Sequence, residues 1–295
     1  MKSLDEGINT IDDFLTFLDV ERNYSTETIK EYKYDLEMLN RFIPSKSLMG
    51  YSTMEIRRFL RHLKQDRSYA APSLHRKICS ARSFFKFLRQ HGHISDDPTE
   101  IIESPKISRS LPKTLAVDDI SRLLEATKNT RDYLIVILLY STGVRVSELC
   151  HLSIGDIDFE QDLIHVVRGK GGKDRKVPLA PHVRDLIRAY AEKLGPPNSN
   201  LPLFRNRSDS RLTARSVQRI VRKAKLTAGI SKKVTPHALR HAFATHLCDN
   251  NVNIRVIQEL LGHASLATTQ LYTHVSLEHL RKTFNEGHPI TTMDV

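Results

Sequence analysis

Apolar residues recur at the three- and four-residue spacing of α-helices through most of this chain, and strand-like alternation is confined to one short stretch. Residues 1–104 contain helical patterns only. Residues 157–179 instead hold alternating runs with a glycine-rich turn, GKGGKD, before the last of them; the runs are Ile157–Phe159, Leu163–Arg168 and Arg175–Leu179. We therefore expect a mainly α-helical chain that carries one small antiparallel β-sheet.

The segment Ser104–Pro112, SPKISRSLP, has two prolines, three serines and no helical period. This composition is typical of an extended linker. We therefore expect a helical domain over residues 1–104, a linker over 105–112 and a second domain over 113–295. A chain of 295 residues is long enough for each domain to have its own core.

The net charge of +11 comes from the second part of the chain. Residues 1–104 hold 16 Lys and Arg against 16 Asp and Glu, whereas residues 105–295 hold 29 against 18. Within the first part, residues 1–40 hold 4 against 10 and residues 41–94 hold 12 against 2, which gives this domain one basic flank. Such segregation predicts a surface that binds a polyanion, most commonly nucleic acid.

Two predicted helices are expected to display basic side chains. In the helix that begins at Pro72, the positions expected to face outward are Arg76, Lys77, Arg82, Lys86 and Arg89. Residues 205–233 hold 10 basic residues against Asp209 alone, on a helix whose inward residues are expected to be Val217, Ile220, Val221 and Leu226. This density favours contact with DNA phosphates, since each neutralised phosphate releases counterions.

Several classes of protein are disfavoured. The three cysteines, Cys79, Cys150 and Cys248, lie inside apolar helical patterns, which argues for a reducing compartment and against a disulfide framework. No apolar run reaches transmembrane length, and MKSLDEGINT lacks the apolar core of a signal peptide. GKGGKD lacks the GK[ST] ending of a nucleotide-binding loop. We expect a cytoplasmic protein that neither enters a membrane nor binds ATP.

Residues 235–274 concentrate side chains that can carry chemistry. Thr235 and Pro236 open a predicted helix on which His237 and Arg240, three residues apart, share one face. The sequence HALRH also has the histidine spacing of a zinc-binding helix. Ala238 stands where the glutamate base of HExxH would be, so zinc hydrolysis is the weaker alternative.

A second predicted helix in this stretch covers Ile254–Leu261 and ends at Gly262, the residue type that usually follows a helix. His263 therefore lies at a turn from which its side chain can reach a cleft, and Tyr272 follows nine residues later. The other two histidines of the first helix, His241 and His246, are expected to be ordinary polar or packing residues.

Two cations precede this stretch. Arg145, in TGVRVSEL, directly follows an apolar helix, and an arginine at such a junction usually binds an anion or a carboxylate; Glu148 can pair or cap nearby. Lys170 lies at the base of the GKGGKD turn, although a lone lysine there is more often simply solvated. An arginine fork, histidines near neutral pH and a tyrosine hydroxyl together suit phosphoryl transfer through a covalent phosphotyrosine.

With these motifs placed, the chain resembles the tyrosine recombinase (phage-integrase-like) family, and its Xer branch in particular. The motifs that carry the resemblance are TGVRVSEL, GKGGKDRKVPL, HALRH, LGHAS and TTQLYTH. The resemblance extends over nearly the whole chain. It implies an N-terminal helical, SAM-like core-binding domain, a tyrosine recombinase catalytic domain, and the catalytic set Arg145, Lys170, His237, Arg240, His263 and Tyr272.

The resemblance also implies the roles of these residues in a reaction that uses no metal and no cofactor. Tyr272 is expected to attack the scissile phosphorus, which leaves a 3′-phosphotyrosyl link and a free 5′-hydroxyl. Arg145 and Arg240 are expected to bind the non-bridging oxygens, with His263 as a further donor. Lys170 is expected to protonate the departing 5′-oxygen, and His237 is expected to act as an assisting acid or base.

The expected partner is double-stranded DNA with a specific recombination site. The resemblance implies a dimer on each site and a tetramer that exchanges strands through a Holliday junction, formed by one protein or with a paralogous recombinase. Xer-type resolution of chromosome dimers is the expected function. The alternatives are an integrase of a phage or mobile element, a type IB topoisomerase and a non-catalytic DNA-binding protein.

Beyond Tyr272, apolar residues at helical spacing predict a short amphipathic helix with Leu277, Leu280 and Phe284 on one face, followed by a loose end, NEGHPITTMDV. A helix of about three turns is not stable alone, so its apolar face must dock. Docking in cis stays open. The resemblance favours docking on a neighbouring protomer.

Overall fold

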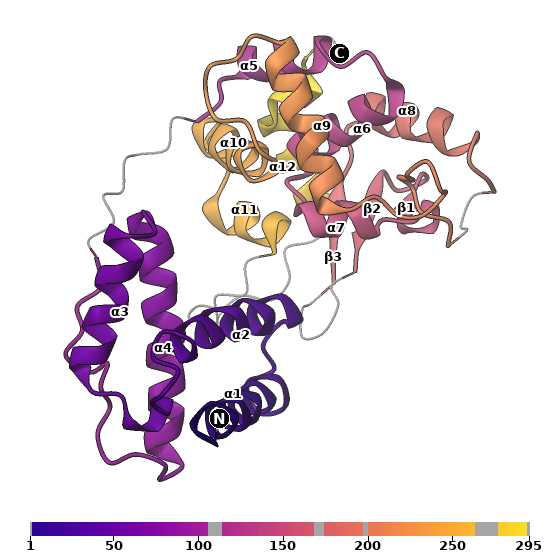
Figure 1. Ribbon diagram of the computed structural model, residues 1–295. Helices are drawn as coiled ribbons and strands as arrows, with labels where there is room; N and C mark the ends of the chain where they lie inside the picture. The colour runs from indigo at the N-terminus through magenta and orange to yellow at the C-terminus, as the bar shows by residue number, and fades with distance from the viewer. Residues whose placement is uncertain (1, 106–113, 168–173, 197–199, 263–276, 294–295) are drawn as a thin grey trace. The chain divides into compact units, whose positions relative to one another are not determined.

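The computed structural model divides into two compact units, Met1–Leu111 and Pro112–Val295 (Figure 1). The residues that it describes are 2–105, 114–167, 174–196, 200–262 and 277–293. All but the first residue of the linker expected over 105–112 lies outside them. Across the described ranges, no helix combines the length and apolar character needed to cross a membrane.

Helices are the only regular secondary structure among the described residues of the first unit. Its helices are α1 (Lys2–Val20), α2 (Thr26–Asn40), α3 (Thr53–Gln65) and α4 (Ala71–Gln90), with a 3₁₀ turn at Leu48–Gly50. The Ser25 hydroxyl accepts a hydrogen bond from the Thr28 N–H at the start of α2, and Ser52 and Glu55 form a capping box at the start of α3. Serine is among the residue types that most often begin α-helices in this way.

A buried ion pair joins α2 to α4 in this unit. Lys77, predicted to face outward, is only 3% exposed, and its Nζ lies 2.7 Å from Asp35 Oδ1. The prediction for Lys77 was wrong because Asp35 of α2 lies opposite this position, and the rings of Tyr34 and Tyr69 cover the ammonium at 5.1 and 5.0 Å. A charge paired and enclosed in this way can be buried.

The second unit combines helices with one small sheet. Its elements are α5 (Val117–Glu125), α6 (Thr130–Thr142), α7 (Val146–His151), a 3₁₀ turn at Ile154–Asp156, β1 (Ile157–Asp158), β2 (Leu163–Val166), β3 (Arg175–Pro178), α8 (Pro181–Ala191), α9 (Ala214–Thr227), α10 (Pro236–Asp249), α11 (Ile254–Leu261), α12 (Leu277–Gly287) and a 3₁₀ turn at Pro289–Thr291. The expected mainly helical class with a small sheet is confirmed.

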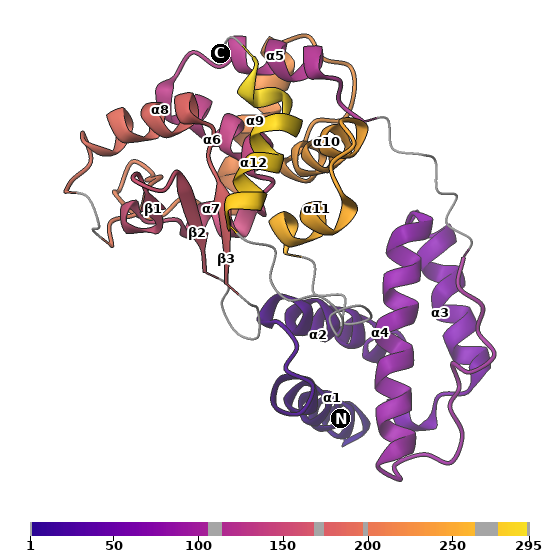
Figure 2. The same ribbon diagram turned by 180° about the vertical axis from the view of Figure 1, so that it is seen from behind.

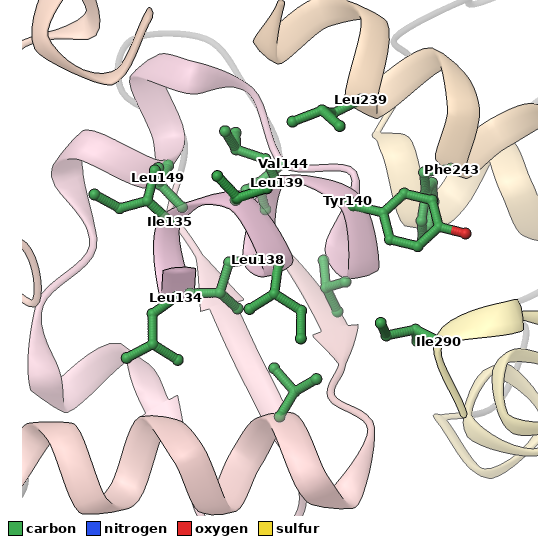
Figure 3. Close-up of a cluster of buried hydrophobic side chains, with 14 of the residues drawn as sticks. Leu134, Ile135, Leu138, Leu139, Tyr140, Val144, Leu149, Leu239, Phe243 and Ile290 are labelled. Atoms are coloured by element: carbon green, nitrogen blue, oxygen red, sulfur yellow. The ribbon is translucent and has the colours of Figure 1, made fainter. Parts of the chain in front are cut away.

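Helix α6 is the centre of the second unit. Every residue from Leu134 to Thr142 is buried. Its side chains meet Leu239 and Phe243 of α10 and Ile290 near the C-terminus (Figure 3). The helix ends at Gly143, whose φ of 60° is left-handed, and a Cβ there would lie 2.6 Å from Phe243 Cδ1. Only glycine fits this turn without strain.

The described strands form an antiparallel sheet in the order β1-β2-β3. Ile157 pairs with Ile164, and Val166 pairs with Arg175 across the hairpin. All three predicted strands are present, each shorter at its end than the alternation suggests. Arg175 is the first residue of β3 and follows the sequence GKGGKD directly.

Helix α9 differs from the prediction at one position. Val217, Val221 and Ala224 make its buried stripe, whereas Leu226 is 71% exposed. Leu226 lies two residues beyond Ala224, which turns its side chain about 200° away from the stripe in a helix of 3.6 residues per turn. The prediction that Leu226 faces inward was therefore wrong.

The C-terminal helix α12 packs against its own chain, beside α10 (Figure 2). Phe284 and Ile290 are 0% exposed and belong to the core of the second unit, and Asn250 Nδ2 donates to the Gly287 carbonyl at 2.7 Å. The favoured docking on a neighbour is not what this structure shows. Nor is the end loose: α12 continues to Gly287 and a buried 3₁₀ turn follows, because Ile290 fills the space beside α6.

Candidate active site

Arg145 lies at the junction between α6 and α7. Its backbone N–H donates to Glu148 Oε2 at 2.7 Å, and its Nη1 donates to Glu148 Oε1 at 3.0 Å. The Arg145 side chain nevertheless keeps 41% of its surface exposed, whereas that of Glu148 keeps 8%. The guanidinium is thus held from one side by a buried carboxylate and open to an anion on the other.

The Glu148 carboxylate is ionised at neutral pH. Burial by itself raises the pKa of this carboxyl, but hydrogen bonds from Arg175 and from the Arg145 backbone outweigh the burial and lower the pKa to about 2. Arg175 supplies a bidentate contact, with Nη1 to Oε1 at 2.9 Å and Nη2 to Oε2 at 2.8 Å. Arg145 and the buried Arg175 therefore share the Glu148 carboxylate.

Arg240, on α10, is 7% exposed and connects the C-terminal ends of two helices, α6 and α11. Its Nη1 donates to the Gly143 carbonyl, and its Nη2 donates to the Leu261 carbonyl at 2.8 Å. Gly143 is two residues before Arg145, and Leu261 is two residues before His263. Arg240 therefore ties together the turn that carries Arg145 and the end of the helix that leads to His263.

His237 lies in the first turn of α10, whose N-cap is Thr235, with the threonine hydroxyl accepting from the Ala238 N–H at 3.1 Å. Its side chain is exposed, one turn before the buried Arg240. The predicted helix start and the order of these residues along one helix are confirmed. Among the described residues, no cluster of His, Cys, Asp and Glu could hold a metal ion.

The remaining candidates, Lys170, His263 and Tyr272, lie outside the described residues. The structure therefore describes Arg145, His237 and Arg240 of the predicted set and links the two arginines through Gly143. His246, predicted to be a packing residue, is buried: its Nε2–H donates to the Leu115 carbonyl at 2.9 Å, which leaves Nδ1 to accept from the Tyr140 hydroxyl at 2.9 Å.

Sequence reasoning missed Arg175, which it read only as the start of a strand. A signal was present. Side chains two residues apart in a strand share a face, so Arg175 lies on the same face as Val177. Val177 is apolar and therefore expected to face the core, and in the structure it is completely buried. A cation on the inward face needs a partner, and TGVRVSEL offers Glu148 as a buried acid.

A basic cavity of about 560 Å³ adjoins the start of α10. One wall comes from α9, where Arg215, Arg219 and Arg222 follow one another at helical spacing and are exposed. The other wall contains Val234, Thr235 and Pro236, directly before His237. A strongly cationic cavity of this kind suits the phosphate backbone of a nucleic acid.

Comparisons with known proteins show which family this chain is similar to. Residues 113–279 match the phage integrase family, and residues 11–92 match the N-terminal SAM-like domain of phage integrases. Tyrosine recombinase XerA of Thermococcus kodakarensis is 42% identical over 283 residues, with 95% of each chain covered. Tyrosine recombinase XerC of Thermodesulfovibrio yellowstonii is 39% identical over 301 residues, with 96% of this chain and 97% of the relative covered.

The fold is also found among solved structures. The lambda integrase in a crystal structure of its dimer bound to a COC′ core site has a TM-score of 0.71 at 21% identity, with 91% of this chain and 98% of that chain covered. At this identity the similarity concerns the fold alone. It matches a mainly helical catalytic domain with a small sheet, preceded by a helical domain.

Proposed function

Because the chain belongs to the phage integrase family and is a tyrosine recombinase, an enzyme that cleaves and rejoins DNA, we propose that it is a site-specific recombinase of the Xer type. Support for the Xer type comes from identities of 39% and 42% to Xer recombinases over nearly the full length of both chains. The proposed biological role is the resolution of chromosome dimers in the cytoplasm.

One observation carries the proposed chemistry: Arg240 binds the turn that directly precedes Arg145. Arg240 binds the carbonyl of Gly143, and Arg145 follows two residues later with its guanidinium fixed by Glu148. Two arginines fixed before the substrate arrives can stabilise the charge that develops on a phosphate in the transition state. Fixed donors lose little freedom at the moment of reaction, which favours the transition state over the bound substrate.

The proposed reaction conserves the phosphodiester energy. The Tyr272 hydroxyl loses its proton to a base and its oxygen attacks phosphorus, while the bond from phosphorus to the 5′-oxygen breaks. Lys170 gives that 5′-oxygen a proton, and His263 and His237 assist as donor and as acid or base. Attack by a 5′-hydroxyl from a second strand reverses the step, releases Tyr272 and joins the strands without a cofactor.

We assign the two units to binding and to catalysis. The first unit, with a proposed domain over residues 1–104, presents exposed arginines on α3, Arg57, Arg58 and Arg61, to the DNA backbone. The second unit, with a proposed domain over residues 113–295, adds the basic cavity beside α10. Arg219→Ala is expected to weaken binding about equally for all DNA sequences. It is also expected to reduce the slope of log K against log[salt] by about 1, because one phosphate contact is lost.

The proposed assembly is a dimer on each DNA site and a tetramer during strand exchange, formed by this protein alone or with a paralogous recombinase. Among similar solved structures are a lambda integrase dimer bound to a core site and a lambda integrase tetramer bound to a Holliday junction. To exchange strands between two duplexes, the 5′-hydroxyl freed on one duplex must attack the phosphotyrosyl link on the other, so each duplex must be cleaved by its own protomer. This requirement favours assembly on two DNA duplexes.

The test is covalent trapping on nicked duplexes with a randomised centre. The nick lets a short strand diffuse away after cleavage, so that the protein stays attached to DNA. The proposal expects a 3′-phosphate adduct on Tyr272, mapped by mass spectrometry, and one preferred sequence among the trapped duplexes. An adduct on a 5′-phosphate, or cleavage without an adduct, would contradict it.

The Xer role needs a second experiment. The trapped sequence is placed twice, as direct repeats, on a plasmid. Excision between identical repeats supports a resolvase-type role, whereas recombination only between two dissimilar sites indicates an integrase of a mobile element. Relaxation of supercoiled plasmid with one site and no recombination indicates a topoisomerase.

A further inference from the structure

We propose that Arg175 is a positioning residue for DNA cleavage: it fixes the Glu148 carboxylate that holds Arg145 and ties that carboxylate to the end of α11. The inference rests on the proposed function, since it concerns the same site. It assigns Arg175 no contact with DNA. Its effect reaches the reacting phosphate only through the groups that Arg175 holds.

The Arg175 side chain is buried and its hydrogen bonds are directed. It is 7% exposed. Its fork donates to both oxygens of Glu148, at 2.9 and 2.8 Å, and its Nε donates to the Leu260 carbonyl at 2.8 Å. Because the guanidinium is planar, these three bonds fix the carboxylate and the carbonyl in one plane relative to each other.

The fixed carboxylate in turn holds Arg145. Glu148 Oε1 accepts from Nη1 of both arginines, and Oε2 accepts from Arg175 and from the Arg145 backbone N–H. Without Arg175, the carboxylate would keep its two bonds to Arg145, one of which comes from a partly exposed side chain, and it would lose its link to the end of α11. With Arg175 in place, Glu148 presents Oε1 to the Arg145 guanidinium in one orientation.

The contact with Leu260 extends the network to another part of the site. Leu260 and Leu261 are the last residues of α11, and each carbonyl receives one arginine, from Arg175 at 2.8 Å and from Arg240 at 2.8 Å. Cations are favourable at this end of a helix. The chain continues through Gly262 to His263, so Arg175 joins the segment before His263 to the carboxylate behind Arg145.

A merely structural ion pair makes a different prediction. If Arg175 only stabilises the fold, its replacement lowers the free energy of unfolding and leaves the cleavage rate of the folded enzyme unchanged. Arg175→Lys keeps the buried positive charge but cannot donate to both Glu148 oxygens and to Leu260 at once. The variant therefore separates charge balance from geometry.

The experiment measures adduct formation in a single turnover, with wild-type enzyme and a nicked duplex obtained by covalent trapping, at saturating DNA. Arg175→Lys is expected to form the adduct between about 10-fold and about 100-fold more slowly, with the Kd for the duplex within about 2-fold of wild type, because a small misplacement of a catalytic group has effects of this order. Thermal unfolding of the variant is measured as well, to establish that it is folded.

The matched control is Arg184→Lys. Arg184 also binds two carboxylates, Asp162 and Asp185, each at 2.8 Å, but on α8 and away from the described site. This variant is expected to cleave at the wild-type rate. Equal rates for Arg175→Lys and wild type would overturn the inference, whereas failure of the wild-type enzyme to form any adduct would overturn the proposed function instead.

A double variant gives the second readout. If Arg175 acts through Arg145, Arg175→Lys adds less than about 2-fold to the defect of Arg145→Lys, since coupled residues are not additive. Multiplication of the two defects would mean that Arg175 does not act through Arg145. If Arg175→Lys does not fold, Glu148→Gln tests the same link: it must slow cleavage at unchanged Kd, and a wild-type rate overturns the inference.

Discussion

Arg240 Nη2 lies 2.8 Å from the Leu261 carbonyl oxygen, and its Nη1 binds the Gly143 carbonyl, so one buried side chain on α10 joins the ends of α6 and α11. Both acceptors are backbone atoms at helix termini. Their positions depend on the turns that end those helices, and Gly143 and Gly262 both have left-handed φ values, 60° and 62°. The geometry of the arginine site therefore depends on two glycines as much as on charged residues.

Gly143→Ala is expected to lower the free energy of unfolding by about 2 kcal/mol or more, because alanine adds left-handed strain and its Cβ would lie 2.6 Å from Phe243 Cδ1. Gly92→Ala is the matched control. Gly92 has φ 73°, but nothing lies within 4 Å of an added Cβ, so strain alone acts, at about 1 kcal/mol. Urea unfolding measures both; equal losses would contradict the close packing at Gly143.

Tyr272→Phe is expected to abolish covalent attachment to DNA while the Kd for the duplex stays within about 2-fold, since only the attacking oxygen is lost. Denaturing gel electrophoresis measures the adduct, and a mobility shift measures binding. Tyr133→Phe is the control for loss of a tyrosine hydroxyl elsewhere in the same unit. A phosphotyrosyl adduct that persists in Tyr272→Phe would disprove the assignment of the nucleophile.

Lys170→Ala is expected to be rescued by a duplex in which sulfur replaces the 5′-bridging oxygen, because a thiolate leaves without a proton. The comparison is the ratio of cleavage rates on the sulfur and oxygen duplexes, which should rise relative to wild type. Arg145→Ala provides the contrast. Its defect concerns the non-bridging oxygens, so the sulfur duplex should not rescue it; an unchanged ratio for Lys170→Ala would move the acid role to another residue such as His237.

Acid is expected to weaken the packing of the C-terminal segment through His288. This ring is 1% exposed among Tyr140, Phe243 and Phe284, and its Nδ1 accepts from the Ile290 N–H at 3.1 Å. Burial, with a smaller contribution from His246, lowers the pKa of His288 to about 3.

The sign of the effect follows from the two protonation states. In the unfolded chain the imidazole has a pKa of about 6.5 and binds a proton below it, whereas the folded protein keeps it neutral. Stability is therefore unaffected above that value and falls as the pH drops, by about 2 kcal/mol at pH 5. His288→Asn cannot titrate, and urea unfolding at pH 7.5 and 5 should show a smaller difference for it. An equal difference in both proteins contradicts the role of His288.

Phe284→Ala is expected to lower the free energy of unfolding by about 3–5 kcal/mol, because the ring is completely buried in the core of its own unit. The effect should not depend on protein concentration, since the packing is within one chain. Glu286→Ala, at a position with 67% side-chain exposure, is the control. A loss below about 1 kcal/mol, or one that appears only at high concentration, would mean that α12 docks elsewhere in solution.

Local sequence patterns were sufficient for most of the fold and for part of the site. Thr235 starts a helix where expected, since a cap depends only on neighbours in sequence. Motif order along the chain also predicted Arg145 and Arg240 as site residues, and the structure links Arg240 to the turn before Arg145. These predictions needed no knowledge of how distant segments pack.

Most of the misses share one physical cause, a contact between segments far apart in sequence; Leu226 is the exception, since the period of its own helix turns it outward. Lys77 faces inward because Asp35 lies on another helix, and Arg175 has its role because Glu148 and Leu260 come from two other elements. The side on which α12 docks depends on the space left beside α6. Helical period gives the apolar face of an element but not the element that covers it.

The buried pair of Lys77 and Asp35 limits how far α4 can slide along α2 in the first unit. Apolar side chains tolerate sliding, because one methyl group can replace another in a contact. A charge in a dry interior has no such substitute: if α4 moved along α2 by one turn, Lys77 and Asp35 would each lose the other, at an expense of several kcal/mol. The pair therefore fixes the register of α4 against α2, and it keeps the exposed Lys86 and Arg89 of α4 at a constant spacing from α2.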